Sequence, residues 1–292
     1  SDADDWLLPQ VGDGRADGDP DAASDIDGGT GDSAEDGEVN QGTPGVDAYG
    51  RPEYDILVRL LGEIRVDGGK DLKPKATAVV AYLALHRSVS TDRLEEACWF
   101  GSGGVSHRKR LRDTMTECRD ALGSQHLPAN RAGAYVSGPR VLTDLDLFNW
   151  HVDQASKLDP QDSAKQFRIA LDLVSGMPFT YSNASRASFG WVDFEHHATT
   201  WEYRVVQVAQ AFTELCIDLG QPEAAIALLR RLVQVIPLNS NLVEALMRAH
   251  VATGDSTGAT KVYDEHACSL EQAGLGEPDE RLERVRVELL RS

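Results

Sequence analysis

The residues with the clearest capacity for chemistry form one basic segment, residues 107–122, which reads HRKRLRDTMTECRDAL. Within it Leu111, Met115, Cys118 and Leu122 recur at intervals that place them on one stripe of an α-helix. That stripe would anchor the helix on a small domain and leave its cationic side chains free for a partner. Guanidinium and ammonium groups presented in this way bind the phosphates and base edges of DNA. A surface helix with solvated charges would give the same pattern, so both interpretations stay open.

The candidate contacts to DNA are the cations of this helix, one hydroxyl on it and two arginines beyond it. They are Arg108, Lys109, Arg110, Arg112, Thr116, Arg119, Arg131 and Arg140. The cations at the start of the helix would contact phosphates and, in part, base edges. Arg108, Arg112 and Arg119 flank the apolar stripe, which suits phosphate contact or packing better than base reading. Arg131 and Arg140 fall on a predicted wing and would contact phosphates or the minor groove. If about four phosphates are neutralised, log affinity should fall with log salt at a slope of about −3.6.

Carboxylates interrupt the basic character of the same helix. Asp113 and Asp120 share with Lys109 and Thr116 the face opposite the apolar stripe, and Glu117 adds a third carboxylate. A carboxylate directed at phosphates removes attraction and must be desolvated, unless it accepts a hydrogen bond from a cytosine amino group. We therefore expect a modest affinity for DNA.

Charge is distributed unevenly along the 292 residues, whose formal net charge is −18. Residues 1–53 contain 15 Asp and Glu against 2 Lys and Arg, whereas residues 54–147 contain 12 against 14. The acidity therefore belongs mainly to the N-terminal segment, and the middle segment is the one suited to a polyanion. The length predicts roughly two domains and a tail.

The tail, residues 1–53, is rich in Asp, Gly, Ser and Ala and lacks periodic apolar residues, which predicts a disordered acidic linker. Because the chain opens with Ser1 rather than Met, we expect a fragment whose upstream part could decide its localisation. No stretch approaches the roughly 18 apolar residues of a membrane span, and no signal segment opens the chain. The four cysteines are widely separated and are expected to be reduced core thiols of a cytosolic protein.

Residues 54–145 are predicted to form a winged helix-turn-helix domain. Two short strands with a turn near Gly62 precede a helix over residues 75–86, and Ser90 would cap a second helix ending near Trp99. The basic helix follows, and residues 134–137 with 140–142 predict a β-hairpin. Strands, three helices with the third basic, and a hairpin form the order of that fold.

Residues 146–292 are predicted to be helical almost throughout and to contain a repeat with an offset of 34 residues. The matched positions are Ala211 and Ala245, Gly220 and Gly254, Ala225 and Ala259, Leu228 and Val262, and Leu229 and Tyr263. Such a period is typical of tetratricopeptide-like repeats, in which each helix pair buries its apolar face on the next.

The order of these segments carries a family resemblance. The segments concerned are residues 58–62 with 64–68, 79–86, 90–99, 119–123, 146–148, 170–179 and 270–278. Together they resemble the SARP-type transcriptional regulators, in which an OmpR/PhoB-like winged helix precedes a bacterial transcriptional activator domain (BTAD). The resemblance implies that the winged helix contacts DNA and that the helical domain mediates dimerisation or RNA polymerase contact. Where the family commonly has Ser-Arg-Leu-Arg-Arg, residues 116–120 of this chain read TECRD, so that Glu117 and Asp120 replace two basic residues.

The leading prediction is thus a mainly α, DNA-binding transcriptional regulator located in the cytoplasm. The alternative is a protein-interaction module, tethered by its linker to a larger protein, in which DNA binding is weak or lost. An enzyme is not expected. The densest group of potential metal ligands is residues 193–197, but adjacent histidines on a helix point about 100° apart and cannot both face one ion. The sequence therefore predicts no catalytic residue, cofactor or metal site, and no membrane insertion.

Overall fold

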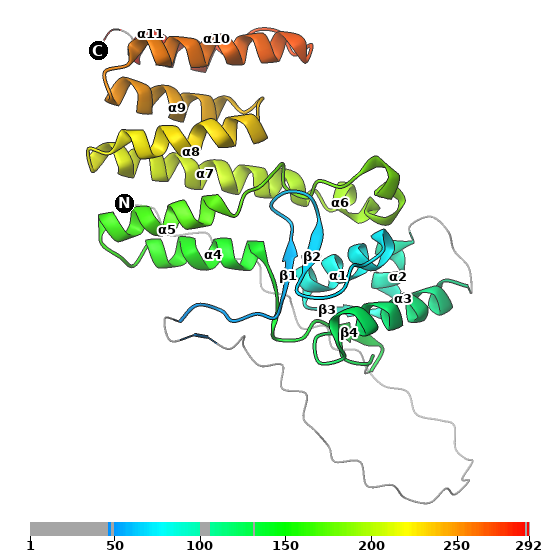
Figure 1. The fold of residues 1–292 in the computed structure, drawn as a ribbon. Coiled ribbons are helices and arrows are strands. Elements are labelled where there is room, and N and C mark those ends of the chain that lie inside the picture. Colours follow the sequence, from blue (N-terminus) through cyan, green and yellow to red (C-terminus); the bar gives the residue numbers. More distant parts are fainter. Residues whose placement is uncertain (1–45, 48–49, 100–105, 131, 290, 292) are drawn as a thin grey trace, which may run out of the picture. The chain divides into compact units, whose positions relative to one another are not determined.

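A computed structural model describes residues 46–47, 50–99, 106–130, 132–289 and 291 (Figure 1). The chain divides into residues 1–40 and a compact unit of residues 41–292, and the description that follows concerns the second unit. The predicted disordered linker lies almost wholly outside the described residues. Arg131 also lies outside them. At its C-terminal end, however, Gly50 accepts a hydrogen bond from Trp150, so residues next to the predicted boundary contact the folded part.

A three-stranded sheet opens the described fold. β1 (Ile56–Arg59) pairs antiparallel with β2 (Arg65–Asp67), which confirms the two predicted strands, and pairs in parallel with β5 (Val141–Thr143) on its other side. The strand order is therefore β2-β1-β5. The apolar residues of β1 do not alternate with polar ones, because this central strand is covered on both faces.

Three helices follow at the predicted places. α1 (Pro74–His86) begins with proline, whose missing N–H costs nothing in the first turn, and buries a nearly continuous apolar run. β3 (Ser88–Ser90) leads into α2 (Thr91–Cys98), where the Ser90 hydroxyl accepts a hydrogen bond from the backbone N–H of Arg93, as the predicted cap requires. The basic segment forms α3 (Ser106–Leu122).

The predicted hairpin is wrong in its pairing. β4 (Ala134–Val136) pairs antiparallel with β3, whereas β5 pairs with β1, so the two strands join different sheets. All three residues of β5 are buried. Pairing with β1 buries both faces of β5, whereas the arm of an exposed hairpin would leave one face in solvent. The turn between the strands packs on the preceding loop: a Cβ on Gly138 would lie 2.7 Å from the carbonyl oxygen of Gln125.

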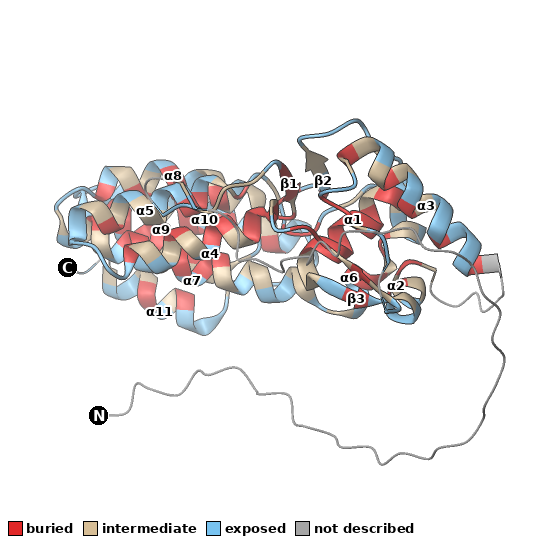
Figure 2. Cartoon of the chain, turned by 90° about the horizontal axis from the view of Figure 1, so that it is seen from below, coloured by how far each residue is buried: buried red, intermediate tan, exposed pale blue. Residues whose placement is uncertain are grey.

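The second half of the chain is helical, as predicted. Its elements are α4 (Asp144–Ala155), α5 (Pro160–Asp172), a 3-10 turn (Asn183–Ser188), α6 (Gly190–Phe194), α7 (His197–Asp218), α8 (Pro222–Val235), α9 (Ser240–Ala252), α10 (Ser256–Gln272) and α11 (Glu280–Leu289). In Figure 1 the helices α7, α8, α9 and α10 stack in chain order. Figure 2 shows their buried residues on the faces that meet.

The 34-residue repeat appears as two helix pairs, α7 with α8 and α9 with α10. Ala225 and Ala259 are both fully buried where the second helix of each pair packs. Gly220 and Gly254 have φ of 69° and 79°, so each ends a first helix in the left-handed conformation that favours glycine. The pair Ala211 and Ala245 does not match, since Ala211 is exposed and Ala245 is buried.

The turn at residues 60–64 joins the sheet to the helical half through its backbone. Leu60 and Leu61 carbonyl oxygens accept hydrogen bonds from the N–H groups of Phe179 and Ser175, and Gly62 accepts one from Thr180. Both contacting segments belong to those that carry the family resemblance. The sequence identified each segment but did not predict that they lie side by side.

The prediction that all four cysteines are core thiols is wrong for one of them. Cys98, Cys118 and Cys216 are buried, but Cys268 is exposed on α10. The three buried thiols are free, which agrees with the prediction of reduced cysteines.

Candidate nucleic-acid interface

α3 is anchored by the predicted apolar stripe. Leu111, Met115, Cys118 and Leu122 are at most 5% exposed, and the Cys118 thiol lies 3.8 Å from the carbonyl oxygen of Ala76 in α1. The opposite side of α3 is exposed, as the pale blue outer surface of that helix in Figure 2 shows. The helix is therefore held by one face and presents the other, which is the geometry that a recognition helix needs.

The N-terminal half of α3 carries the exposed cations. Arg108 pairs with Asp92 at 2.9 Å and lies 3.9 Å from Glu95, both on α2, although its own side chain stays 68% exposed. The side chains of Lys109, Arg110 and Arg112 are exposed and have no hydrogen-bond or ion-pair partner among the residues that the structure describes. We call these three residues the free cation patch.

The position of the free cation patch opposes helix stability. The first turn of α3 contains no acidic residue, although the positive end of the helix dipole favours carboxylates there. Adjacent cations add mutual repulsion, which Asp92 relieves only for Arg108. A bound phosphate would remove both penalties, because helix N-termini with cationic side chains bind anions.

The carboxylates of α3 differ in their surroundings. Glu117 lies 3.5 Å from Nζ of Lys73, so its charge is partly balanced by the residue that precedes α1. Asp113 and Asp120 are exposed and have no ion-pair partner in the described part of the chain. The face opposite the apolar stripe is therefore mixed in charge, as the sequence predicts.

Three further predicted contacts have hydrogen-bond partners within the fold. The Arg119 guanidinium donates to the carbonyl oxygens of Leu127 and Pro128, which fixes the loop after α3. The Thr116 hydroxyl donates to the Arg112 carbonyl oxygen but remains exposed. Arg140 forms a two-pronged ion pair with Asp55 and lies 2.7 Å from Glu53.

The ion pair of Arg140 is reflected in the pKa of its partner. The hydrogen bond from Arg140 lowers the pKa of the Asp55 carboxyl below its ordinary value. Arg140 is thus bound to carboxylates at the start of β1 and does not join the cations of α3. The structure brings together Arg108, Lys109, Arg110 and Arg112 and separates Arg140 from them, while Arg131 lies outside the described residues.

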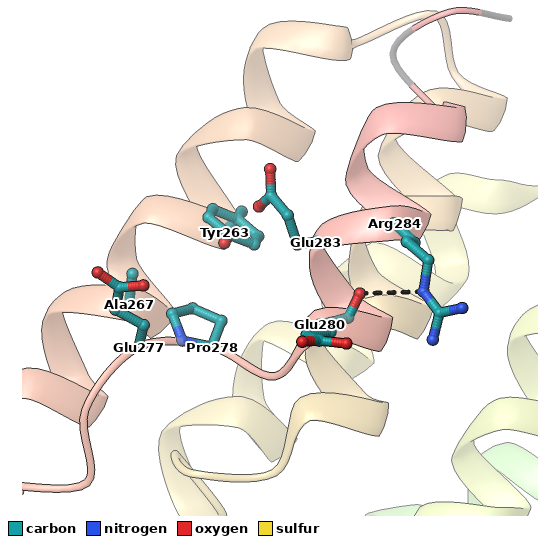
Figure 3. Close-up of a pocket in the computed structure, with 7 residues that line it drawn as sticks. All are labelled: Tyr263, Ala267, Glu277, Pro278, Glu280, Glu283 and Arg284. Atoms are coloured by element: carbon teal, nitrogen blue, oxygen red, sulfur yellow. Dashed lines mark hydrogen bonds between the residues drawn. The ribbon is translucent and has the colours of Figure 1, made fainter.

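A cavity of about 670 Å³ lies between α10 and α11 (Figure 3). It is lined by Tyr263, Ala267, Glu277, Pro278, Glu280, Glu283 and Arg284. Three carboxylates against one guanidinium make this hollow unsuited to a polyanion. It therefore does not extend the candidate interface.

Sequence reasoning missed one cluster of polar side chains. His197 and His86, which are 111 positions apart, both lie within hydrogen-bond distance of Glu195. The argument that adjacent histidines on a helix diverge does not apply to this segment, because α6 ends at Phe194 and His196 is in the left-handed conformation before α7. No local spacing indicates that α1 supplies a second imidazole. No helix of the described residues is long and apolar enough to cross a membrane.

These elements define a class of two-domain protein, a winged helix-turn-helix domain followed by a tetratricopeptide-like helical domain. A family model described as "Bacterial transcriptional activator domain" matches residues 143–290. The chain belongs to this family, which consists of transcriptional regulators, and the resemblance to SARP-type proteins is confirmed.

Two known proteins resemble most of the chain. "Regulatory protein AfsR" of Streptomyces griseus is 24% identical over 240 residues, which cover 80% of this chain and 24% of AfsR. The solved structure "Mycobacterium tuberculosis EmbR in complex with low affinity phosphopeptide" has a TM-score of 0.60 at 22% identity, covering 82% of this chain and 66% of that one. The chain thus spans about a quarter of AfsR, and the likeness to EmbR concerns the fold.

Proposed function

We propose that this chain is a DNA-binding transcriptional regulator whose α3 enters the major groove. The observation that carries the proposal is the free cation patch, Lys109, Arg110 and Arg112, which is exposed at the start of a helix anchored by its other face. Arg108 would join these contacts by leaving Asp92, an exposed ion pair of small strength. Thr116 lies on the same exposed side and would donate to a phosphate or base.

The number of free cations sets the expected salt dependence. Three phosphate contacts give a slope of about −2.7 for log affinity against log salt, and a fourth contact by Arg108 gives about −3.6. Asp113 and Asp120 reduce the attraction, because they lie on the face that would meet the groove. The expected affinity is therefore modest and strongly dependent on salt.

Charge variants on α3 test the proposal. We expect Arg110→Glu with Arg112→Glu to weaken binding to a random-sequence duplex pool and to make the slope shallower by about 0.9 for each lost contact. The matched control is Lys165→Glu with Lys261→Glu, which changes net charge equally on exposed lysines of α5 and α10. Fluorescence anisotropy at several salt concentrations measures both. Binding that is absent, or equal in the α3 variant and the control, would refute the proposal.

The acidic residues give a second, opposite test of the same face. If α3 faces the phosphates, Asp113→Asn with Asp120→Asn should raise affinity, because the change removes two repulsive charges. An unchanged affinity would mean that this face does not meet DNA. The pair of tests thus separates specific docking of α3 from diffuse attraction to the whole domain.

A second candidate function is favoured by the two unpaired carboxylates on α3. In this alternative the fold is kept as a protein-interaction module, tethered to a larger protein, and DNA binding is weak or lost. Salt-insensitive behaviour toward DNA, together with a protein partner crosslinked to the helical domain, would support it. The charge variants above decide between the two functions.

The remaining parts of the proposal concern the helical domain and its surroundings. We place the boundary between the DNA-binding domain, residues 54–145, and the activator domain, residues 146–292, in the first turn of α4. The helical repeats would mediate dimerisation or contact with RNA polymerase. EmbR is described with a bound phosphopeptide, which supports protein contacts for this family but assigns no peptide here. The role is regulatory rather than enzymatic and requires a cytoplasmic location.

A further inference from the structure

A cluster of metal-ligating side chains is formed where α1 meets the segment between α6 and α7. His86 is the last residue of α1, Glu195 follows α6, and His197 is the first residue of α7. The Glu195 Oε2 atom lies 2.7 Å from Nε2 of His197 and 3.1 Å from Nε2 of His86. All three donor atoms lie within 4.8 Å of one another. We propose that His86, Glu195 and His197 form a binding site for a divalent transition-metal ion of the zinc type.

The backbone is strained where it brings these ligands together. His196, between Glu195 and His197, has a φ of 54°, and Arg87, directly after His86, has a φ of 64°. The left-handed conformation is unfavourable for residues other than glycine. In a continuous helix, side chains two residues apart diverge by about 200°. The left-handed residue interrupts the helix, so that both flanking side chains reach one point, and strain of this kind concentrates at functional sites.

Surrounding side chains fix the orientation of the ligands. The Tyr82 hydroxyl donates to Oε1 of Glu195 at 2.9 Å, and Nε of Arg93 donates to the same Tyr82 oxygen at 3.0 Å. This arrangement leaves Oε2 for the two imidazoles. Phe179 stacks on the His197 ring, with ring centres 5.5 Å apart and planes 20° apart. Metal sites are commonly oriented by such outer partners.

The donor set fits the chemistry of zinc. Two imidazole nitrogens and one carboxylate oxygen form a three-ligand site that keeps a fourth position open. Bonds of about 2.0–2.1 Å in a tetrahedral site place the ligand atoms roughly 3.3 Å apart. A metal therefore requires the two contacts of Oε2, now 2.7 and 3.1 Å, to lengthen by a few tenths of an ångström, and the two imidazole nitrogens, which lie within 4.8 Å of each other, to reach the same separation.

Access and charge around the cluster are also defined. A cavity of about 200 Å³, lined by Glu195 together with Tyr82, Arg93 and Trp191, offers an approach to the carboxylate. The one nearby permanent cation, among the described residues in contact with Glu195, is Arg93, whose Nη2 lies 3.8 Å from Oε1. That contact is on the carboxylate oxygen that the imidazoles do not use. A bound ion would join α1 of the winged helix to the start of the helical domain.

Zinc titration of the whole chain tests the site. The chain is used without an affinity tag, after treatment with chelator, and in a Cys268→Ser background that removes the exposed thiol. We expect calorimetry to give one Zn²⁺ per chain, and Co²⁺ to give the visible bands of a low-coordinate nitrogen and oxygen site. His86→Gln and His197→Gln should each weaken binding by at least about tenfold.

A matched control separates this site from other histidines. His250, whose Nδ1 lies 2.9 Å from Asp255, forms another pair of imidazole and carboxylate, and His250→Gln should leave zinc binding unchanged. Glu195→Gln keeps the size of the side chain while removing its charge, so it tests the site if a histidine variant fails to fold. No stoichiometric binding by the parent chain, or parent-like binding by a folded Glu195→Gln chain, would overturn the proposal.

Discussion

Asp144 offers a sharp test of how the two halves of the chain are joined. Its side chain is 1% exposed, and its two oxygens accept hydrogen bonds from the backbone N–H groups of Leu60 at 2.8 Å and Leu61 at 3.1 Å. The residue begins α4 and therefore connects the helical half to the turn after β1. Burial raises the pKa of Asp144 from 3.8 to about 6, although both backbone donors act in the opposite direction.

The direction of this pKa shift determines how stability depends on pH. Because the folded-state pKa is raised, the folded chain holds the proton more tightly than the unfolded chain does. The contribution to stability is full below the ordinary pKa and is lost as pH rises through the folded pKa. The raised pKa lowers the free energy of unfolding above about pH 7.5 by about 3 kcal/mol relative to the protonated state. Of this decrease, about 1.4 kcal/mol occurs between about pH 5 and 7.5.

We therefore expect Asp144→Asn to respond to pH differently from the parent chain. The amide cannot ionise, so the stability of the parent relative to the variant should fall by about 1.4 kcal/mol on going from about pH 5 to about pH 7.5. Urea unfolding followed by circular dichroism at both pH values measures this difference. Asp153→Asn, an exposed carboxylate on the same helix, serves as the control. Parallel behaviour of the parent and Asp144→Asn would refute the reasoning.

Three further predictions concern packing and thiol exposure. Met115→Ala should lower the free energy of unfolding by about 2–5 kcal/mol because it opens a cavity beneath α3, whereas exposed Lys109→Ala should change it by less than about 0.5 kcal/mol in the same urea assay. Gly62→Ala should lower the Tm in a thermal melt, because Gly62 has a φ of 152° and its Cβ would lie 2.2 Å from Oγ of Ser175; Gly190, where a Cβ has open space, is the control. Iodoacetamide should label Cys268 in the native chain and spare Cys98, Cys118 and Cys216, since burial raises the pKa of those thiols to about 12, 12 and 11; mass spectrometry that finds a second rapid label would contradict the fold.

Features set by neighbouring residues could be predicted from the sequence. The apolar stripe of α3 follows from helical periodicity alone, and all four of its members are buried. Ser90 caps α2 because its side chain reaches a backbone N–H three residues ahead. The 34-residue repeat could also be recognised, since the glycines end helices and the buried alanines allow helices to pack closely.

Features set by distant residues could not be predicted in the same way. The two strands after α3 have a turn between them and look like a hairpin, but β5 pairs with β1, more than eighty positions earlier. Arg140 pairs with Asp55 across a similar separation, and no spacing rule indicates that contact. The cluster around Glu195 was missed for the same reason, because His86 approaches it from another element.

The candidate interface shows most clearly what the structure adds. By sequence, Arg119 and Arg140 are candidate donors to phosphate alongside the cations at the start of the basic helix. In the structure Arg119 holds backbone carbonyls and Arg140 holds carboxylates, so each would lose existing bonds before it met DNA. The side chains of the free cation patch, by contrast, would break no existing bonds. A phosphate would also relieve their repulsion by the positive end of the helix dipole. A measured salt slope between about −2.7 and about −3.6, the second value including Arg108, is therefore expected if pairing within the fold decides which cations bind, whereas contacts by Arg119 and Arg140 as well would make it steeper.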